Sequence, residues 1–235
     1  ALERCRLDAD HIVLEALAQS CSLLSDEEIE TGVVVTDIGG DITNVAIYYD
    51  NAIRHTAVVP LGGKNVTNDI AIGLRTPVDR AESLKLNQGA ALASLVDPEE
   101  MVTVHGAAGR PAKEVSRHVL ASIIEPRMEE IFSLVAREIK RAGVSEAPAN
   151  GMVLTGGGAL LDGTIELAEQ IFDLPVREGI ITNIETTPDE LNNNRYATAH
   201  GLLVYAFSNE PVTRRRKGGM GRLLKRFENW ISRQF

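Results

Sequence analysis

The sequence Asp37-Ile38-Gly39-Gly40-Asp41-Ile42-Thr43-Asn44 decides the fold, because it stands between two runs that are typical of β-strands. The β-branched run at residues 32–38 predicts a buried strand. Two further strands are expected at Thr43–Tyr49 and Ala52–Val59, joined by a turn at Asp50-Asn51. The sequence therefore predicts a hairpin unit whose first bend is made of glycine.

The glycine bend is also suited to binding phosphate. Without a Cβ atom, Gly39 and Gly40 let backbone N–H groups approach phosphate oxygens closely. Thr43 adds a hydroxyl donor, and Asp37 stands at the strand end, where it can hold Mg²⁺ or a water bound to it. The alternative for this stretch is an ordinary glycine hairpin turn.

A second glycine run, Leu154-Thr155-Gly156-Gly157-Gly158-Ala159, follows a buried-strand pattern and opens a helical one. A nucleotide fits such a place, because the backbone can approach it and a helix N-terminus favours negative charge. The alternative is a closely packed turn from strand to helix. The two motifs lie about 115 residues apart, each at a strand end, and together they are more specific than either alone.

The remainder of the chain alternates between helical and strand patterns, which implies α/β layers. Short strands are expected at 102–104 and from Pro175. Helices are expected at 10–24, 66–73, 78–93, 114–141 with an interruption at Pro126, after 158 to Phe172, and 195–207.

With both glycine motifs in view, the chain resembles the actin superfamily and, within it, the FtsA family of bacterial cell-division proteins. Residues 37–44 resemble the superfamily's second phosphate loop, and residues 155–159 resemble its adenosine motif. Further similarities lie in the connecting helices at 15–20 and 195–205, in the stretches 54–77 and 124–127, and in the C-terminal tail. The resemblance implies a partial actin-like, ribonuclease-H-like ATPase fold of the α/β class. It covers only the latter part of the family's length, so the first phosphate loop and the family's extra subdomain are expected to lie outside this chain.

The resemblance also implies a division into parts. The expected parts are the end of a first lobe with its connecting helix (1–30), the core of a second lobe (31–76 and 149–194), a small outer subdomain (77–148), a second connecting helix (195–208), a linker (209–219) and a membrane-binding amphipathic helix (220–235).

By the same resemblance, Glu82 and Lys85 are expected to contact the ribose or adenine of ATP, alongside Asp37, Gly39, Gly40, Thr43 and Gly156-Gly157-Gly158. Taken by themselves, Glu82 and Lys85 stand three apart on a helix, and the alternative is a surface ion pair. Gly62 and Gly63 are expected either under the phosphates or in a plain turn into a helix. The sequence departs from the family at Asp41, which replaces a glycine, and at Asn44, which replaces an acid. These two departures are expected to affect ATP hydrolysis more than ATP binding.

The chain has 235 residues and a net charge of −9, which hides an asymmetry. Residues 214–235 hold eight basic residues and one acid, a net +7, whereas the rest holds 16 basic and 32 acidic residues, a net −16. Such a tail points to an anionic partner of its own. Two cysteines without a CxxC pair favour a reducing compartment. The histidines show no metal-ligand spacing, and no apolar run reaches 18 residues.

The tail carries a narrow apolar stripe at helical spacing, with basic residues on its other faces. These features are typical of a helix that lies in a membrane interface, with binding that is modest per copy. One alternative is that the apolar stripe docks on the protein's own body. The other is that Arg214–Lys217 binds nucleic acid. We expect no nucleic-acid partner, because a basic segment that binds nucleic acid does not need an apolar stripe. The expected membrane contacts are Leu223, Leu224, Lys225, Phe227, Trp230, Ile231 and Phe235.

The family resemblance implies a filament-forming protein that binds ATP with Mg²⁺ and anchors the division protein FtsZ to the cytoplasmic face of the bacterial inner membrane at the division site. Its expected partners are the FtsZ C-terminal peptide, further copies of itself and anionic lipid, and its ATPase activity is at most weak. Arg110, Arg117 and Arg127 are the expected contacts for the acidic FtsZ peptide, and their alternative is solvated surface. The alternative functions are a pilus-assembly relative, or an ATPase or sugar kinase of the same superfold.

Overall fold

A five-stranded mixed sheet forms the centre of the computed structural model, which describes residues 2–6, 8–9, 11–106, 110–143, 148–181 and 193–209. Its strand order is β3-β2-β1-β6-β7. Strands β1 (Val33–Ile38), β2 (Thr43–Tyr49) and β3 (Ala52–Val59) form the expected antiparallel unit. Strands β6 (Met152–Thr155) and β7 (Val176–Glu178) continue the sheet in parallel with β1.

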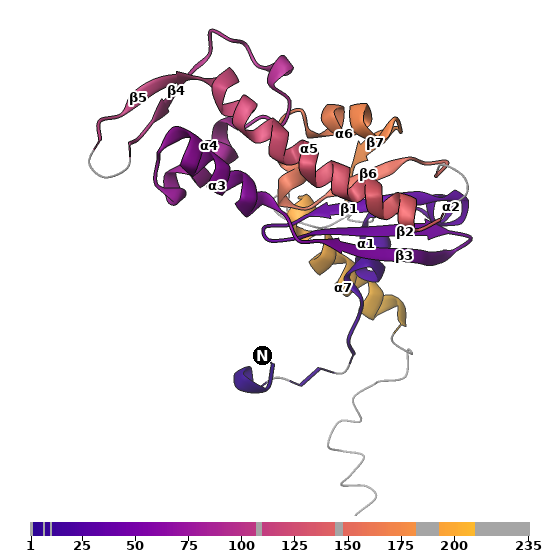
Figure 1. Ribbon diagram of the computed structural model, residues 1–235. Helices are drawn as coiled ribbons and strands as arrows, with labels where there is room; N and C mark the ends of the chain where they lie inside the picture. Colours follow the sequence, from indigo (N-terminus) through magenta and orange to yellow (C-terminus); the bar gives the residue numbers. More distant parts are fainter. Residues whose placement is uncertain are drawn as a thin grey trace, which may run out of the picture.

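Helices cover both faces of this sheet, which is why its central strands are buried almost throughout (Figure 1). On one face lie α5 (Arg117–Arg141) and α6 (Thr164–Phe172), over a core that includes Val34, Ile38 and Ile47. On the other face lie α1 (Glu15–Leu23) and α7 (Ala197–Asn209), near Val33, Val35 and Tyr48. Alternate residues of β1 thus serve two different cores.

The helices α1 and α7, far apart in the sequence, pack closely against each other. Gly201 makes this approach possible, because a Cβ atom there would overlap the carbonyl group of Ala18. The Tyr48 hydroxyl group ties α1 to the sheet by donating a hydrogen bond to the Ala16 carbonyl at 2.5 Å.

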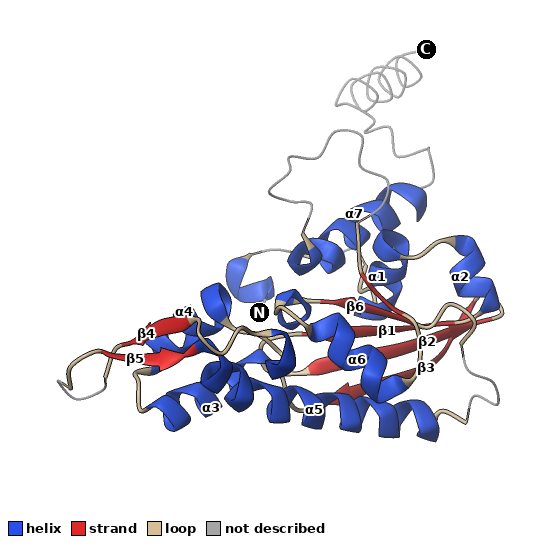
Figure 2. Cartoon of the chain, turned by 90° about the horizontal axis from the view of Figure 1, so that it is seen from above, coloured by secondary structure: helices blue, strands red, loops and turns tan. Residues whose placement is uncertain are grey.

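Beside the sheet stands a smaller unit built from α3 (Gly63–Leu74), α4 (Val78–Gln88), the short helix η2 (Ala93–Leu95), and the strand pair β4 (Met101–Val104) and β5 (Lys113–Ser116). The long helix α5 begins at the end of β5 and runs from this unit to the sheet (Figures 1 and 2). Four further short elements are described: η1 (Leu2–Cys5), α2 (Asp26–Thr31), η3 (Gly157–Leu160) and η5 (Asn194–Tyr196).

Several of the expected elements need correction. The first helix begins at Glu15 rather than at residue 10, and α4 ends at Gln88. Helix α2 was not expected, although Ser25 and Glu28 form a capping box at its start. Strand β5 occupies residues that were expected to begin the long helix.

The expected interruption of α5 at Pro126 does not occur. The helix continues through the proline, and Ile124, Met128 and Ile131 lie on its buried side, each with at most 1% of its surface exposed. Burial of apolar side chains on both sides of the proline offsets the hydrogen bond that the proline removes.

Within the described helices, none is both long and apolar enough to cross a membrane. The linker was expected at 209–219, but Asn209 is the last residue of α7. The rest of that linker, the amphipathic helix expected at 220–235 and residues 182–192 lie outside the described residues. The membrane contacts expected there, and the division of the chain into lobes, stay predictions.

Candidate functional site

The two glycine loops leave the sheet side by side. Asp37 of β1 pairs in register with Thr155 of the parallel strand β6, so Gly39 and Gly156 follow at the same edge. This is the carboxyl edge of parallel strands, where α/β sheets commonly bind ligands. The sequence-predicted motifs, about 115 residues apart, are therefore brought together by strand pairing.

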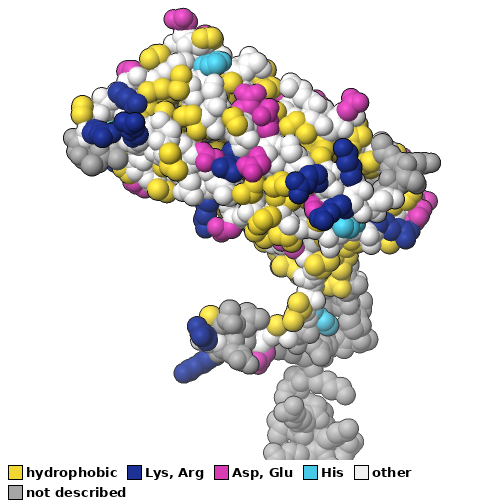
Figure 3. Space-filling model, viewed as in Figure 1, with side chains coloured by type: hydrophobic (Ala, Val, Ile, Leu, Met, Phe, Trp, Pro, Cys, Tyr) yellow, Lys and Arg dark blue, Asp and Glu magenta, His cyan; other side chains and the backbone are white. Residues whose placement is uncertain are grey.

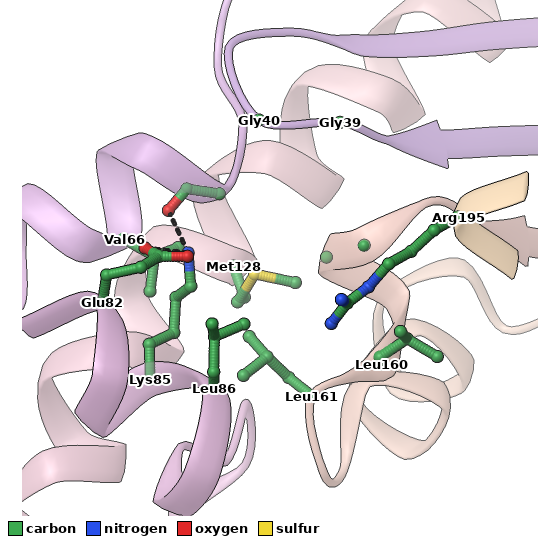
Figure 4. Close-up of a pocket in the computed structure, with 13 residues that line it drawn as sticks. Gly39, Gly40, Val66, Glu82, Lys85, Leu86, Met128, Leu160, Leu161 and Arg195 are labelled. Atoms are coloured by element: carbon green, nitrogen blue, oxygen red, sulfur yellow. Dashed lines mark hydrogen bonds and ion pairs between the residues drawn. The ribbon is translucent and has the colours of Figure 1, made fainter. Parts of the chain in front are cut away.

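A cavity of about 250 Å³ opens between these loops and helix α4. Figure 4 shows Glu82 and Lys85 on one side of it and Arg195 on the other, with Met128 and Leu161 between them. Its lining residues are Gly39, Gly40, Gly63, Val66, Glu82, Lys85, Leu86, Met128, Gly157, Gly158, Leu160, Leu161 and Arg195.

The first glycine loop is hydrogen-bonded to the start of α3. The backbone N–H groups of Gly63 and Lys64 donate to the carbonyl oxygens of Gly39 and Gly40 at 2.9 and 2.8 Å. A Cβ atom at Gly62 would lie 2.7 Å from the Gly39 oxygen, so only glycine allows this approach. The loop thereby has a fixed shape and borders the cavity with little side-chain bulk.

The three glycines after β6 have different surroundings. Gly156 has a φ angle of +83° and lies against Asp37, and a Cβ atom at Gly158 would overlap the Ile38 side chain. A Cβ atom at Gly157 would meet nothing nearer than the Arg195 Nε atom, at 4.0 Å. Gly156 and Gly158 therefore serve packing, whereas Gly157 faces the cavity.

On the opposite wall, Lys85 is buried and fully engaged. Its Nζ atom donates to Glu82 Oε2 at 2.7 Å, to Thr67 Oγ1 at 2.9 Å and to the Gly63 carbonyl at 3.1 Å. Burial pushes the pKa of Glu82 upward, but hydrogen bonds from Lys85 and Thr67, with the charges of Lys85 and Arg195, outweigh it and lower that pKa. Glu82 is thus ionised at neutral pH, and its carboxylate can accept hydrogen bonds from ribose hydroxyl groups.

An adjoining hollow of about 430 Å³ contains Asp37 and shares Gly39, Gly157 and Arg195 with the cavity. Gln19 of α1 donates from its Nε2 atom to Asp37 Oδ2 at 2.5 Å. Burial raises the pKa of Asp37, the hydrogen bond from Gln19 opposes this, and the charge of Glu15 adds to the rise. Asp37 is thus a carboxylate whose charge is not fully compensated by the protein.

The hollow also connects the two packed helices. Gln19 Nε2 lies 3.1 Å from Thr198 Oγ1 of α7, and Thr198 donates to Glu15 Oε1 at 3.1 Å. Asn44 donates to Glu15 Oε2 at 2.9 Å. Asp37 is therefore joined to both α1 and α7 by polar side chains.

The structure gathers most of the predicted site residues. The cavity is lined by Gly39, Gly40, Glu82, Lys85, Gly157 and Gly158, and the hollow by Asp37 and Gly156. Thr43 is a correction: its side chain is buried, its hydroxyl donates to the Leu61 carbonyl at 2.9 Å, and it lines neither space. Asp41 points elsewhere, forming an exposed ion pair with Lys64 at 2.8 Å.

The three arginines expected to contact a partner differ in their surroundings. Arg117 bridges Glu100 and Asp162, at 3.0 and 2.6 Å. Arg127 holds Asp69 with two nitrogens, at 2.6 and 3.1 Å. Arg110 is exposed. Figure 3 shows Lys and Arg side chains gathered at the end of the molecule formed by β4 and β5. The expected peptide contacts stay a prediction.

Sequence reasoning missed Arg195 and the apolar wall of the cavity. Val66, Leu86, Met128, Leu160 and Leu161 come from four different segments, and only the tertiary fold brings them together. Such a wall, with a few polar groups, is typical of small-molecule sites. For Arg195 the local signal was its place at the start of a connecting helix.

Mg²⁺ bound together with a nucleotide fits the residues present. Within the described ranges, no group of three or more His, Cys, Asp and Glu side chains is placed to hold a metal ion. Mg²⁺ needs only one or two carboxylates when phosphates supply further ligands. Asp37 and Glu15 both border the hollow and meet that requirement.

Comparison with known proteins places the chain in a family. A family model described as "Cell division protein FtsA" matches residues 34–201. The chain belongs to the FtsA family. It is 44% identical over 209 residues to the cell division protein FtsA of Pseudomonas aeruginosa, covering 89% of this chain and 50% of that protein. It is 38% identical over 247 residues to FtsA of Escherichia coli K12, covering 100% of this chain and 59% of that protein. The chain thus spans between half and three fifths of the length of these FtsA relatives.

Solved structures confirm the actin-like fold of this FtsA-family chain. MreB5 of Spiroplasma citri bound to ADP matches with a TM-score of 0.69 at 18% identity, covering 88% of this chain and 62% of that one. The PilM–PilN type IV pilus biogenesis complex matches with a TM-score of 0.62 at 18% identity, covering 87% and 55%. At this identity the two structures show the fold alone.

Proposed function

We propose that this FtsA-family chain binds ATP in the cavity between the glycine loops and helix α4. The observation that carries the proposal is the convergence of Gly39-Gly40, Gly157 and the Glu82–Lys85 pair on one partly apolar cavity. The solved structure of MreB5 of Spiroplasma citri with ADP supports it, because an actin-like relative binds such a nucleotide.

The lining suggests how the nucleotide lies. Leu86, Met128 and Leu161 offer apolar surface to the base, and the Glu82 carboxylate can accept hydrogen bonds from the ribose. The loop at Gly39-Gly40 and the adjoining hollow then receive the phosphates. Asp37 would hold Mg²⁺, which neutralises phosphate charge when bound. We propose at most a weak ATPase activity.

In the cell, we propose that the protein polymerises and anchors FtsZ filaments to the cytoplasmic face of the bacterial inner membrane at the division site. Membership of the FtsA family supports this function. The basic, apolar-striped sequence at 220–235 supports the membrane contact. Because a single helix of this kind binds modestly, a polymer would bind the membrane by avidity. The pilus-assembly alternative has only a shared fold in its favour.

Liposome co-sedimentation of the intact protein tests the anchor. Deletion of residues 219–235 removes the apolar stripe and the adjacent basic residues, so we expect it to abolish sedimentation with vesicles containing anionic lipid and to leave ATP binding unchanged. The matched control replaces Phe227, Trp230 and Ile231 by serine in the full-length tail, which keeps the basic charge and removes apolar area. Co-sedimentation of the deletion variant equal to that of the unmutated protein would overturn the anchor.

A further inference from the structure

Arg195 occupies the junction of the cavity and the adjoining hollow. It lines both spaces, and its Nε atom is the nearest described atom to the open side of Gly157, at 4.0 Å from a Cβ atom built there. Figure 4 shows its guanidinium group extending into the cavity, opposite Glu82 and Lys85. The side chain is exposed, so the cavity can be filled without breaking a packed contact of Arg195.

The two cations of the site, Lys85 and Arg195, differ in how many hydrogen bonds and ion pairs they form. Lys85 is held by Glu82, Thr67 and a backbone carbonyl, and so its charge is already paired. Among the residues that the structure describes, no hydrogen bond or ion pair engages the Arg195 guanidinium. Its charge helps to lower the pKa of Glu82, after the stronger effects of burial, Lys85 and Thr67.

The cavity and the adjoining hollow are lined by more carboxylates than cations, so an unpaired cation is needed to balance a bound polyphosphate. The described lining holds three carboxylates, Glu15, Asp37 and Glu82, against Lys85 and Arg195. A nucleotide polyphosphate adds several negative charges beside Asp37. Without Arg195, no unpaired cation of the described protein would face those charges.

We propose that Arg195 pairs directly with a phosphate group of the bound nucleotide, and that it provides the protein's preference for phosphorylated ligands over the bare nucleoside. This inference rests on the proposed ATP site and adds a residue and a role to it. A guanidinium group can donate two parallel hydrogen bonds to phosphate oxygens, which an ammonium group cannot match. Its place beside Gly39 and Gly157, and bordering the Asp37 hollow, favours phosphate over stacking on the base.

Isothermal titration of the intact protein with adenosine, AMP, ADP and ATP tests the role. For Arg195→Gln we expect affinities for AMP, ADP and ATP to fall about tenfold, as when a charged hydrogen-bond partner is lost. The affinity for adenosine should stay within about twofold, and Arg195→Lys should recover part of the loss. The matched control, Arg137→Gln, removes the same charge from an exposed position nine residues beyond Met128 on α5 and should change none of these values.

Three results would overturn the proposal. Equal affinities of Arg195→Gln and unmutated protein for ATP and ADP would exclude a phosphate contact. A loss for adenosine as large as that for ATP would assign Arg195 to the base or the sugar instead. If unmutated protein bound none of the four ligands, the proposed ATP site itself would fail, whereas the first two results leave that site standing.

Discussion

Asp37 is a carboxylate that the fold buries at a cost to its charged form. Burial raises its pKa, and Gln19 compensates only in part. A residue that destabilises the ligand-free protein in this way is a candidate for function. A bound cation would stabilise the charged carboxylate and so recover the folding free energy that its burial costs. Asp37 therefore connects stability and ligand binding in one side chain.

We expect Asp37→Asn to stabilise the ligand-free protein and to weaken its Mg²⁺-dependent ATP binding. The folded pKa is raised, so ionisation of Asp37 costs folding free energy once the pH exceeds the unfolded value of about 4. The gain from Asn should be absent below that pH, grow above it and level off once the folded carboxyl group is ionised. Urea denaturation between pH 4 and 8 measures it; a variant that is less stable at pH 7.5 would contradict the account.

Among single residues, the sequence was most informative where a contact is local. The positions of Gly39, Gly40 and Gly157 at the ends of β1 and β6 could be predicted, because each glycine run directly follows a buried-strand pattern. The role of Thr43 could not, since its hydroxyl is taken by the Leu61 carbonyl, a contact of the folded chain. The role of Arg195 could not be predicted either, because the residues next to it in the sequence do not indicate that the folded chain places it opposite Lys85.

At the scale of elements, Arg117 connects three segments at the N-terminus of α5. It donates to the carbonyl of Gln88, the last residue of α4, at 2.9 Å and pairs with Glu100 and Asp162. Asp162 follows the second glycine loop, and its backbone bonds to Ala91. The arginine thereby links the small unit of α3, α4 and β4–β5 to the cavity wall.

We expect Arg117→Met to lower the free energy of unfolding by about 1–2 kcal/mol, through loss of two ion pairs and a hydrogen bond. The matched control is Arg110→Met, at an exposed position on the loop between β4 and β5, which should change stability by less than about 0.5 kcal/mol. Urea denaturation compares the two. Equal stabilities would mean that Arg117 is ordinary solvated surface and free to contact a partner.

Most element types were predictable from periodicity, and the bounds of the central strands were predicted better than those of the helices. The β-branched strands of the central sheet lie within a residue of the expected places. Pro126 shows the limit, because the tendency of proline to end a helix was overridden by burial of Ile124 and Met128. The short strand β5 begins with the exposed, charged residues Lys113 and Glu114, and its pairing with β4 rather than its own pattern makes it a strand.

For the whole molecule, the resemblance carried by the two glycine motifs, the stretches 54–77 and 124–127 and the C-terminal tail implied the family and the actin-like fold, and the comparisons confirm both. The cavity itself could not be predicted, since its walls come from the sheet edge, from α4 and from the start of the last connecting helix. The basic, apolar-striped sequence at 220–235, which we propose as the membrane contact, follows α7 in the sequence.

Titration of ATP with Mg²⁺ into the intact protein and its Gly157→Val variant tests the central claim most directly. Gly157 faces the cavity with open space beside it, so a branched side chain should fold normally and occupy the position of the nucleotide. We predict at least a tenfold loss of affinity with an unchanged melting temperature, whereas Gly158→Val, which would overlap Ile38, should melt earlier. Unaltered ATP affinity in a folded Gly157→Val variant would contradict the assignment of this cavity to ATP.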